Sequence, residues 1–454
     1  MADRLVVWVY GTRLATLSRA SNLRIAMSWE EAGIARWGRG SRILSTSLPL
    51  GEPISARDDA PTNFFEDLLP EGRARDVMAR FAGVSPHDTF AILAEWGREC
   101  AGAVSLTREG ETPPGDDDGS YVGYAANELD HALRRLDRTP LGADATVGFK
   151  PSLAGFQRKL LVGRGASGQW QRPIGGAPST WILKPDGRVP IAENEVACLC
   201  LARRVGLSTP LCELIHIGGT PTVAIERYDR HGRKRIHQED ASQATGSPAG
   251  FKYEQQGGPS LRSFARILIN YGLANDPIDL LRRATFNVVI GNADAHGKNF
   301  SVLHPAEDAA ITLAPVYDVI ATTSLRPVDR HGSPVPNDPT MGQSINGVSD
   351  VTQVGRDDLV NEAASWGLRP RRAAEVVDDL IERMRSDTDA PDWLAAVVAR
   401  RASTLSGRTA PRAVAHGNRR PPIASRSGSP SACGAETTKG VPCRRRGACP
   451  YHTP

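Results

Sequence analysis

The chain has 454 residues, of which 40% are hydrophobic and 23% charged, and its formal net charge at pH 7 is +4. These values are typical of a soluble globular protein with two or three domains. Because basic and acidic residues nearly balance, the bulk charge does not favour a nucleic-acid binder. No apolar run approaches the roughly 18 to 20 residues that a membrane-spanning helix needs.

The N-terminal quarter predicts a small α/β unit. Residues 4–18 alternate around a Tyr-Gly turn, which favours two hairpin strands. Residues 64–83, "FFEDLLPEGRARDVMARFAG", are typical of a helix, and residues 88–106 of a helix followed by a strand. Turn formers and acids across 108–120 indicate a surface loop. This start does not fit a signal peptide, so we expect a cytoplasmic protein whose seven cysteines are thiols or metal ligands.

A second α/β unit follows, and after it the pattern becomes helical. Strand-like runs at 158–164, 179–185 and 212–230 flank a helix over 191–207, which predicts a small sheet with a helix packed on it. From about residue 260 the apolar residues recur with helical spacing. The sequence therefore predicts an α+β protein with five segments. They are an N-terminal subdomain, a sheet lobe, a helical lobe, a disordered linker and a cysteine-bearing tail: 1–140, 145–258, 259–408, 409–430 and 431–454.

One polar motif interrupts the helical region. In "GNADAHGKNFS", Asp294 and Asn299 stand in the order D-x-x-x-x-N with His296 between them, and Asp318 follows the apolar run 311–317. Protein kinases use this order: the first aspartate orients or deprotonates the acceptor hydroxyl, while the asparagine and the second aspartate hold magnesium. An amide oxygen adds a hard ligand for magnesium without adding repulsive charge. We expect Lys298 to act with Asp294 in catalysis by screening the transferring phosphate.

The upstream parts of such a site occur in the expected order. Lys184 ends a predicted strand, Glu195 lies on the next helix, and the backbone from Glu226 to Tyr228 follows a strand suited to a hinge that meets adenine. Taken singly, each of these residues is better explained as a turn, a helix cap or a solvated charge. The set in this order is what favours a kinase.

With these motifs the chain resembles the HipA family of bacterial serine/threonine kinases, the toxins of HipBA-type toxin–antitoxin systems. The similarity runs from about residue 4 to 405 and is carried by motifs such as "FFEDLLPEG", "SLAGFQRKLLV", "WILKP", "AIERYDR" and "PVYDVIAT". The resemblance implies a HipA-like kinase fold with an N-terminal α/β subdomain, a β-containing N-lobe and a mainly helical C-lobe. It also implies roles for single residues. Asp294 is expected as catalytic base, Asn299 and Asp318 as magnesium ligands, and Lys184, Glu226, Tyr228 and His296 as ATP-binding residues.

The segment from Ser152 resembles the family's phosphate loop. No G-x-x-x-x-G-K-[ST] or G-x-G-x-x-G motif occurs where a nucleotide loop is needed, so "SLAGFQRKLLVGRG" is the candidate cover for the phosphates. The resemblance implies that autophosphorylation of Ser152 expels this loop and switches the enzyme off, although an ordinary loop serine fits equally well. Phe156 and Arg158 replace residues of the family's usual "GAQEK". Residues 237–240 match another family motif, but Asp240 could equally cap the following helix.

The last 22 residues contain three cysteines and a histidine. Three thiolates and one imidazole suit a closed structural zinc site, and the pattern resembles short zinc-binding tails of bacterial proteins. So short a segment has no core of its own, so metal would supply its folding free energy. The alternative is a tail of unused thiols beside a solvated arginine run. The predicted zinc ligands are Cys433, Cys443, Cys449 and His452.

The resemblance also implies cofactors and partners. ATP and magnesium are expected as cofactors, a HipB-like antitoxin as partner, and a protein such as an aminoacyl-tRNA synthetase as substrate. DNA is expected to be reached only through the antitoxin. Two other function classes stay open. A small-molecule or lipid kinase is one, because D-x-H-x-x-N also resembles the loop of phosphoinositide kinases; a non-catalytic module that binds antitoxin and DNA is the other.

Overall fold

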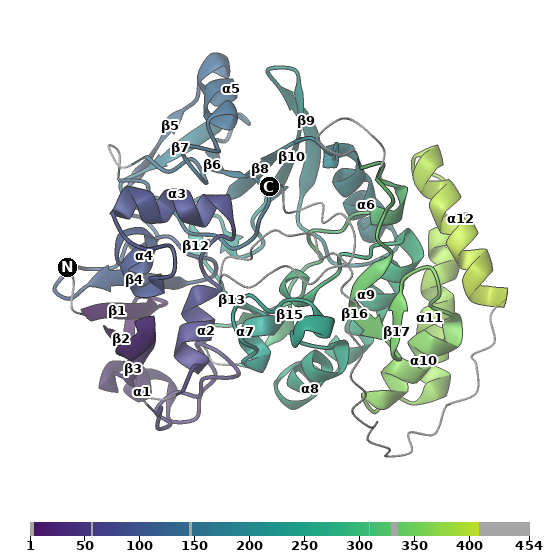
Figure 1. Ribbon diagram of the computed structural model, residues 1–454, viewed down its shortest axis with the longest axis horizontal. Coiled ribbons are helices and arrows are strands. Elements are labelled where there is room, and N and C mark those ends of the chain that lie inside the picture. Colours follow the sequence, from purple (N-terminus) through teal and green to yellow (C-terminus); the bar gives the residue numbers. More distant parts are fainter. Residues whose placement is uncertain (1–3, 56–57, 145–147, 308, 328–334, 408–454) are drawn as a thin grey trace, which may run out of the picture.

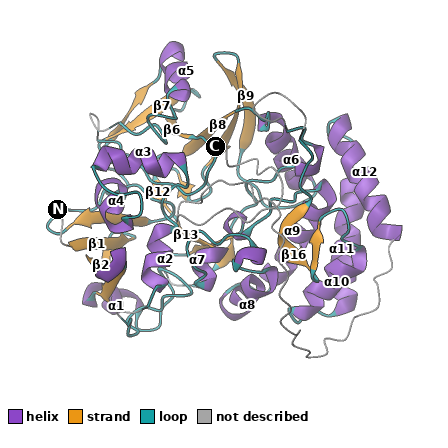
Figure 2. Ribbon diagram, viewed as in Figure 1, coloured by secondary structure: helices purple, strands orange, loops and turns teal. Residues whose placement is uncertain are grey.

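The computed structural model describes residues 4–55, 58–144, 148–307, 309–327 and 335–407, and Figure 1 shows them as a ribbon. The architecture is mixed α+β, as the sequence predicted (Figure 2). Three parts are visible: an N-terminal α/β unit, a sheet lobe and a helical lobe. None of the helices described here is long and apolar enough to cross a lipid bilayer.

The N-terminal unit is an antiparallel sheet in the order β3-β2-β1-β4 with helices packed against it. The predicted hairpin is present, and Tyr10 (φ 49°) and Gly11 (φ 71°) supply the two positive φ angles that a tight hairpin turn requires. The sheet and helices share a buried core that includes Leu17 and Phe64. Its elements are β1 (Arg4–Val9), β2 (Thr12–Arg19), β3 (Ile25–Trp29), α1 (Glu31–Trp37), α2 (Ala60–Glu66), α3 (Arg73–Ala82), α4 (Thr89–Trp96) and β4 (Val104–Arg108).

The expectation of one helix over 64–83 is wrong, because the chain forms α2 and α3 with a break between them. Pro70 lies in that break, where its ring cannot continue a regular helix. Gly72 adopts φ +58°, and a Cβ there would lie 2.5 Å from the Phe156 ring. The break thus lets the backbone turn and brings the phosphate-loop segment close to it.

The sheet lobe holds an antiparallel sheet in the order β5-β7-β6-β8-β10-β9, with a helix on each face. Leu183 and Ala224 face α5, whereas Val223 and Ile225 face α6. The elements are β5 (Ser120–Gly123), α5 (Ala126–Arg134), β6 (Leu160–Arg164), β7 (Trp170–Ile174), β8 (Trp181–Pro185), α6 (Ala192–Arg204), β9 (Cys212–Ile217) and β10 (Thr220–Glu226). Strand β5 and helix α5 therefore lie with this sheet, although the sequence grouped residues up to 140 with the first subdomain.

The helical lobe is built around α9 (Asp276–Ile290), whose second half is buried throughout. A helix that is buried on all sides belongs to the centre of a lobe, and α9 contacts the helices around it. The helices that contact it are α8 (Leu261–Tyr271), α10 (Arg356–Ser365), α11 (Pro370–Arg385) and α12 (Asp392–Gly407), and α7 (Ala241–Thr245) packs on α8. The short strands are β11 (Arg230–His231), β12 (Lys234–Arg235), β13 (His237–Asp240), β14 (Ser301–His304), β15 (Thr312–Leu313), β16 (Thr340–Ile345) and β17 (Val348–Asp350).

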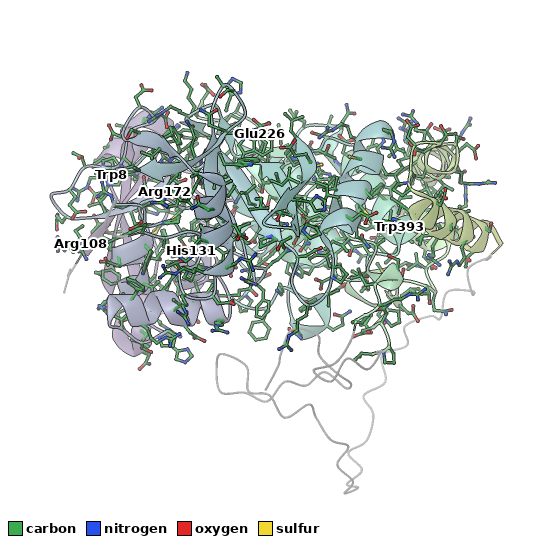
Figure 3. The ribbon with its side chains drawn as sticks, turned by 90° about the horizontal axis from the view of Figure 1, so that it is seen from above. Trp8, Arg108, His131, Arg172, Glu226 and Trp393 are labelled. Atoms are coloured by element: carbon green, nitrogen blue, oxygen red, sulfur yellow. The ribbon has the colours of Figure 1, made fainter. Side chains whose placement is uncertain are left out.

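Seen from above, Trp8 and Arg108 lie toward one end of the molecule and Trp393 of α12 toward the other, with Glu226 between them (Figure 3).

Asp240 caps α7, because its carboxylate accepts hydrogen bonds from the amides of Ser242 (2.8 Å) and Gln243 (3.0 Å). The capping alternative for Asp240 is confirmed.

Candidate active site

The polar loop, residues 291–300, begins where α9 ends. Gly291 takes the left-handed conformation (φ 71°) that commonly ends a helix. The Asn292 side chain then donates to Asn287 Oδ1 (2.9 Å) and accepts from the amide of Asp294 (3.1 Å). Asp294 is half-exposed, whereas its neighbours from Gly291 to Ala293 are buried. The buried asparagine pair therefore holds the backbone that presents the Asp294 carboxylate.

Lys184, Glu195 and Asp318 form one ion cluster. The Lys184 ammonium lies 2.6 Å from Glu195 Oε1 and 2.9 Å from Asp318 Oδ1. Burial works against ionisation of both Lys184 and Asp318. Asp318 and Glu195 nevertheless hold the pKa of Lys184 above its ordinary value, and Lys184 lowers the pKa of Asp318 to about 2. The lysine is thus a fixed cation at neutral pH, held beside a carboxylate whose side chain is 39% exposed.

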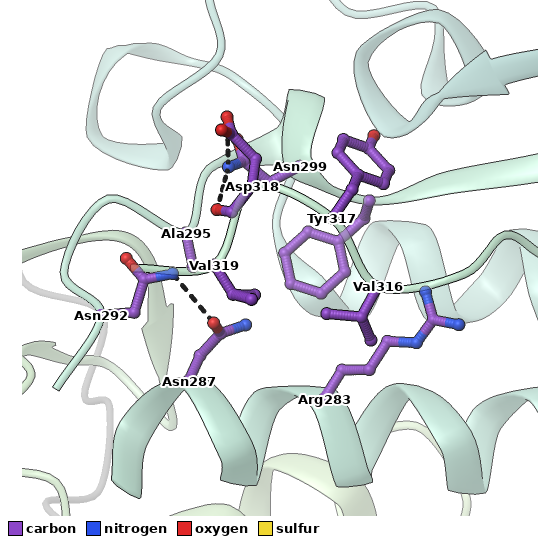
Figure 4. Close-up of a pocket in the computed structure, with 10 residues that line it drawn as sticks. Arg283, Asn287, Asn292, Ala295, Asn299, Val316, Tyr317, Asp318 and Val319 are labelled. Atoms are coloured by element: carbon purple, nitrogen blue, oxygen red, sulfur yellow. Dashed lines mark hydrogen bonds between the residues drawn. The ribbon is translucent and has the colours of Figure 1, made fainter. Parts of the chain in front are cut away.

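Asp318 and Asn299 lie together in a narrow pocket (Figure 4). The Asn299 amide donates to the carbonyl (3.2 Å) and carboxylate (3.3 Å) of Asp318, and its Oδ1 is buried with no hydrogen-bond partner among the described residues. Asp318 has φ +55°, a conformation uncommon for a residue with a side chain. Carboxylate and amide oxygens are hard ligands, so the pair fits magnesium. Across the described ranges no group of three or more His, Cys, Asp or Glu side chains could hold a metal.

The hinge residues contribute differently from one another. Glu226 pairs with Trp181 across β10 and β8, on the sheet face opposite Lys184, and both line a separate pocket of about 230 Å³. The backbone of Glu226, rather than its carboxylate, is therefore what a ligand on the Lys184 side of the sheet could use. The Tyr228 ring stacks on Tyr317 with centroids 5.2 Å apart, so it connects the hinge to the residue before Asp318.

Two other loop residues are buried. His296 is 7% exposed, its ring meets Tyr253 edge-on at 5.3 Å, and burial lowers its pKa to about 4, which makes it neutral. The Lys298 ammonium lies 2.9 Å from Asp67 and 3.4 Å from Glu71, both of which come from the break between α2 and α3. Lys298 thus joins the polar loop to the N-terminal unit. Nothing in the loop's own sequence indicated these partners, although "FFEDLLPEG" contains them.

The phosphate-loop segment lies against the N-terminal unit. Ser152 is fully buried; its hydroxyl donates to the Leu68 carbonyl (2.8 Å) and its amide to the Glu99 carbonyl (2.7 Å). The two residues that depart from the family pattern add contacts of their own. Phe156 covers Gly72, and Arg158 donates to the carbonyl of Leu133 (3.1 Å). Phosphate can reach Ser152 only if this loop leaves its place.

Lys159 is a residue that the sequence reasoning missed. It is 9% exposed and donates to the Ala154 carbonyl (2.7 Å), and burial together with Lys184 lowers its pKa to about 8. Its place in "GFQRK" was the available signal.

The predicted zinc ligands Cys433, Cys443, Cys449 and His452 lie outside the described residues.

Comparison with known proteins places two family models on the chain. A family model described as HipA-like C-terminal domain matches residues 151–388, and one described as HipA N-terminal domain matches residues 5–107. The putative kinase Y4mE of Sinorhizobium fredii is 36% identical over 334 residues, which cover 70% of this chain and 77% of that protein. The serine/threonine-protein kinase toxin HipA of Shewanella oneidensis is 28% identical over 305 residues, 63% of this chain and 68% of the toxin.

A solved structure shares the fold. One chain of the Shewanella oneidensis complex of HipA, HipB and operator DNA superposes with a TM-score of 0.69 at 22% identity, covering 88% of this chain and 95% of that one. Identity this low supports the fold alone.

Proposed function

The chain belongs to the HipA family, and we propose that it is an ATP- and magnesium-dependent serine/threonine protein kinase. The observation that carries the proposal is the Lys184–Glu195–Asp318 cluster, which lies beside Asn299, whose Oδ1 has no hydrogen-bond partner among the described residues. A fixed cation, a hard-ligand pair and a half-exposed aspartate are the parts that phosphoryl transfer needs.

Each residue has a proposed task. Lys184 holds the ATP phosphates, the backbone near Glu226 and Tyr228 meets adenine, and neutral His296 lines the phosphate side. Magnesium, held by Asn299 and Asp318, would neutralise phosphate charge. Asp294 accepts the proton of the acceptor hydroxyl while the acceptor oxygen bonds to the γ-phosphorus and the bond to ADP breaks.

We further propose that the chain is the toxin of a type II toxin–antitoxin system in the cytoplasm. A HipB-like antitoxin is its partner, DNA is reached through the antitoxin, and a translation-related protein such as an aminoacyl-tRNA synthetase is its substrate. The support is the relative named as a kinase toxin and the fold shared with a HipA chain in complex with HipB and operator DNA. Ser152 is the proposed autophosphorylation site, and its burial agrees with a switch that requires loop release.

The test is phosphoryl transfer by an Asp294→Asn variant. Loss of a base in contact with the reacting hydroxyl is expected to reduce autophosphorylation at least a hundredfold, with ATP affinity retained. Asp117→Asn, in the exposed loop before β5, is the matched control and should behave as wild type. Activity that persists in Asp294→Asn would overturn the assignment. Transfer to lipids or small alcohols but not to proteins would favour the small-molecule kinase.

A further inference from the structure

A tyrosine from outside the polar loop contacts the proposed catalytic base. Tyr253 lies between α7 and α8, and its hydroxyl donates to Asp294 Oδ1 over 2.9 Å. Its ring packs edge-on against His296. A general base must bind the acceptor hydroxyl over about 2.6 to 3.2 Å. The phenol therefore makes the same kind of contact, at the same distance, that the acceptor hydroxyl has to make.

The backbone around Tyr253 is held on both sides. The Lys252 carbonyl accepts from the amide of Gly297 (2.9 Å), and its ammonium binds Glu71 (3.0 Å). On the other side, the Glu254 carboxylate accepts from the amide (2.6 Å) and hydroxyl (2.8 Å) of Ser344. These contacts tie the segment to the polar loop, to the N-terminal unit and to β16. Movement of the phenol away from Asp294 is thus a rotation of the side chain rather than a loop opening.

We propose that Tyr253 is a specificity-determining residue, whose hydroxyl occupies the acceptor position on Asp294 until a substrate displaces it. This rests on the proposed role of Asp294 as the base. Displacement costs a hydrogen bond to a carboxylate. A protein acceptor offsets that loss through its other contacts with the enzyme, whereas water has none to offer. Tyr253 thereby favours transfer to protein hydroxyls over hydrolysis of ATP.

The test compares Tyr253→Phe with wild type in the full chain, using ATP hydrolysis without added acceptor. The phenylalanine keeps the ring contact with His296 and removes only the hydroxyl. We expect the hydrolysis rate to rise roughly tenfold, because water no longer has to displace a charge-assisted hydrogen bond from Asp294. The KM for ATP should stay within about twofold of wild type. Tyr271→Phe is the matched control and should leave hydrolysis unchanged. Tyr271 is the last residue of α8, and its ring lies under the Arg42 guanidinium rather than beside Asp294.

A gain of activity cannot arise from misfolding, so an unchanged or lower rate in Tyr253→Phe would overturn the inference. Phosphate found on Tyr253 by mass spectrometry would also overturn it, because the residue would then be an acceptor. Failure of the proposed function looks different. In that case Asp294→Asn keeps full autophosphorylation, whatever the behaviour of Tyr253→Phe.

Discussion

Two clusters near the polar loop each hold a buried lysine between two carboxylates, one around Lys184 and one around Lys298. They differ in how exposed their carboxylates are. Lys184 and Lys298 have side chains only 9% and 7% exposed. The Lys184 partner Asp318 is 39% exposed, whereas the Lys298 partner Asp67 is 3% exposed. A ligand can therefore approach the first cluster at Asp318, whereas the second is more enclosed: Asp67 is buried at the contact with the N-terminal unit and Glu71 is 26% exposed. The same ion-pair chemistry serves binding in one place and domain attachment in the other.

Removal of Lys184 is the change with the largest expected effect on activity. Lys184→Met should lower phosphoryl transfer roughly 10³-fold, because the phosphates lose their fixed cation. ATP binding and autophosphorylation measure this, and Lys234→Met, at an exposed position of β12, is the control. An active Lys184→Met enzyme would remove the distinction between the two clusters.

Removal of Lys298 should act mainly on stability. Lys298→Met leaves the Asp67 carboxylate buried without its cation, which costs about 3 kcal/mol of unfolding free energy. Urea unfolding measures the loss, and adding Asp67→Asn should recover part of it because the unpaired charge is then gone. If the double variant is stable but inactive, Lys298 acts on the transferring phosphate, and the second cluster belongs with the first.

The pH dependence of ATP use should depend on Lys159, which lies near the first cluster. Its pKa of about 8 means that the ammonium is charged below pH 8 and neutral above it. If its charge attracts phosphate, kcat/KM for ATP falls up to about tenfold per pH unit above 8, and Lys159→Arg abolishes the decline. The folded-state pKa lies below the usual 10.5, so the unfolded chain binds more protons between the two values and unfolding free energy rises there with pH. A flat profile in the wild type would exclude Lys159 from phosphate binding.

The tail should have the smallest effect on the kinase. We propose that Cys433, Cys443, Cys449 and His452 bind one zinc ion, and removal of residues from 425 onward should abolish zinc binding while autophosphorylation stays within about twofold. Metal analysis and kinase assays on both proteins measure this. Zinc retained after truncation would place the metal elsewhere. Lost activity would mean that the tail supports one of the two clusters.

The residue types and their order could be read from the sequence, and with them much of the fold. The hairpin at Tyr10, the strand that contains Lys184, helix α6 with Glu195 and the helical second half all follow from local periodicity, which depends on near neighbours alone. Local pattern did not show what packs against the break between α2 and α3. Pro70 ends the helix locally, but the ring that lies against Gly72 comes from Phe156, far away in the chain.

Contacts between distant segments were decided only by the tertiary structure. The sequence alone indicated a kinase-type set, because the residue types occur in the order that kinases use. The set is Lys184, Glu195, Asp294, Asn299 and Asp318. It did not show that Lys298 pairs with Asp67 and Glu71, that Glu226 faces away from Lys184, or that Tyr253 binds Asp294. Each of these depends on how sheet, loop and N-terminal unit pack together. A buried charge or hydroxyl takes whichever partner the fold brings within hydrogen-bond distance, and spacing along the chain does not encode that choice.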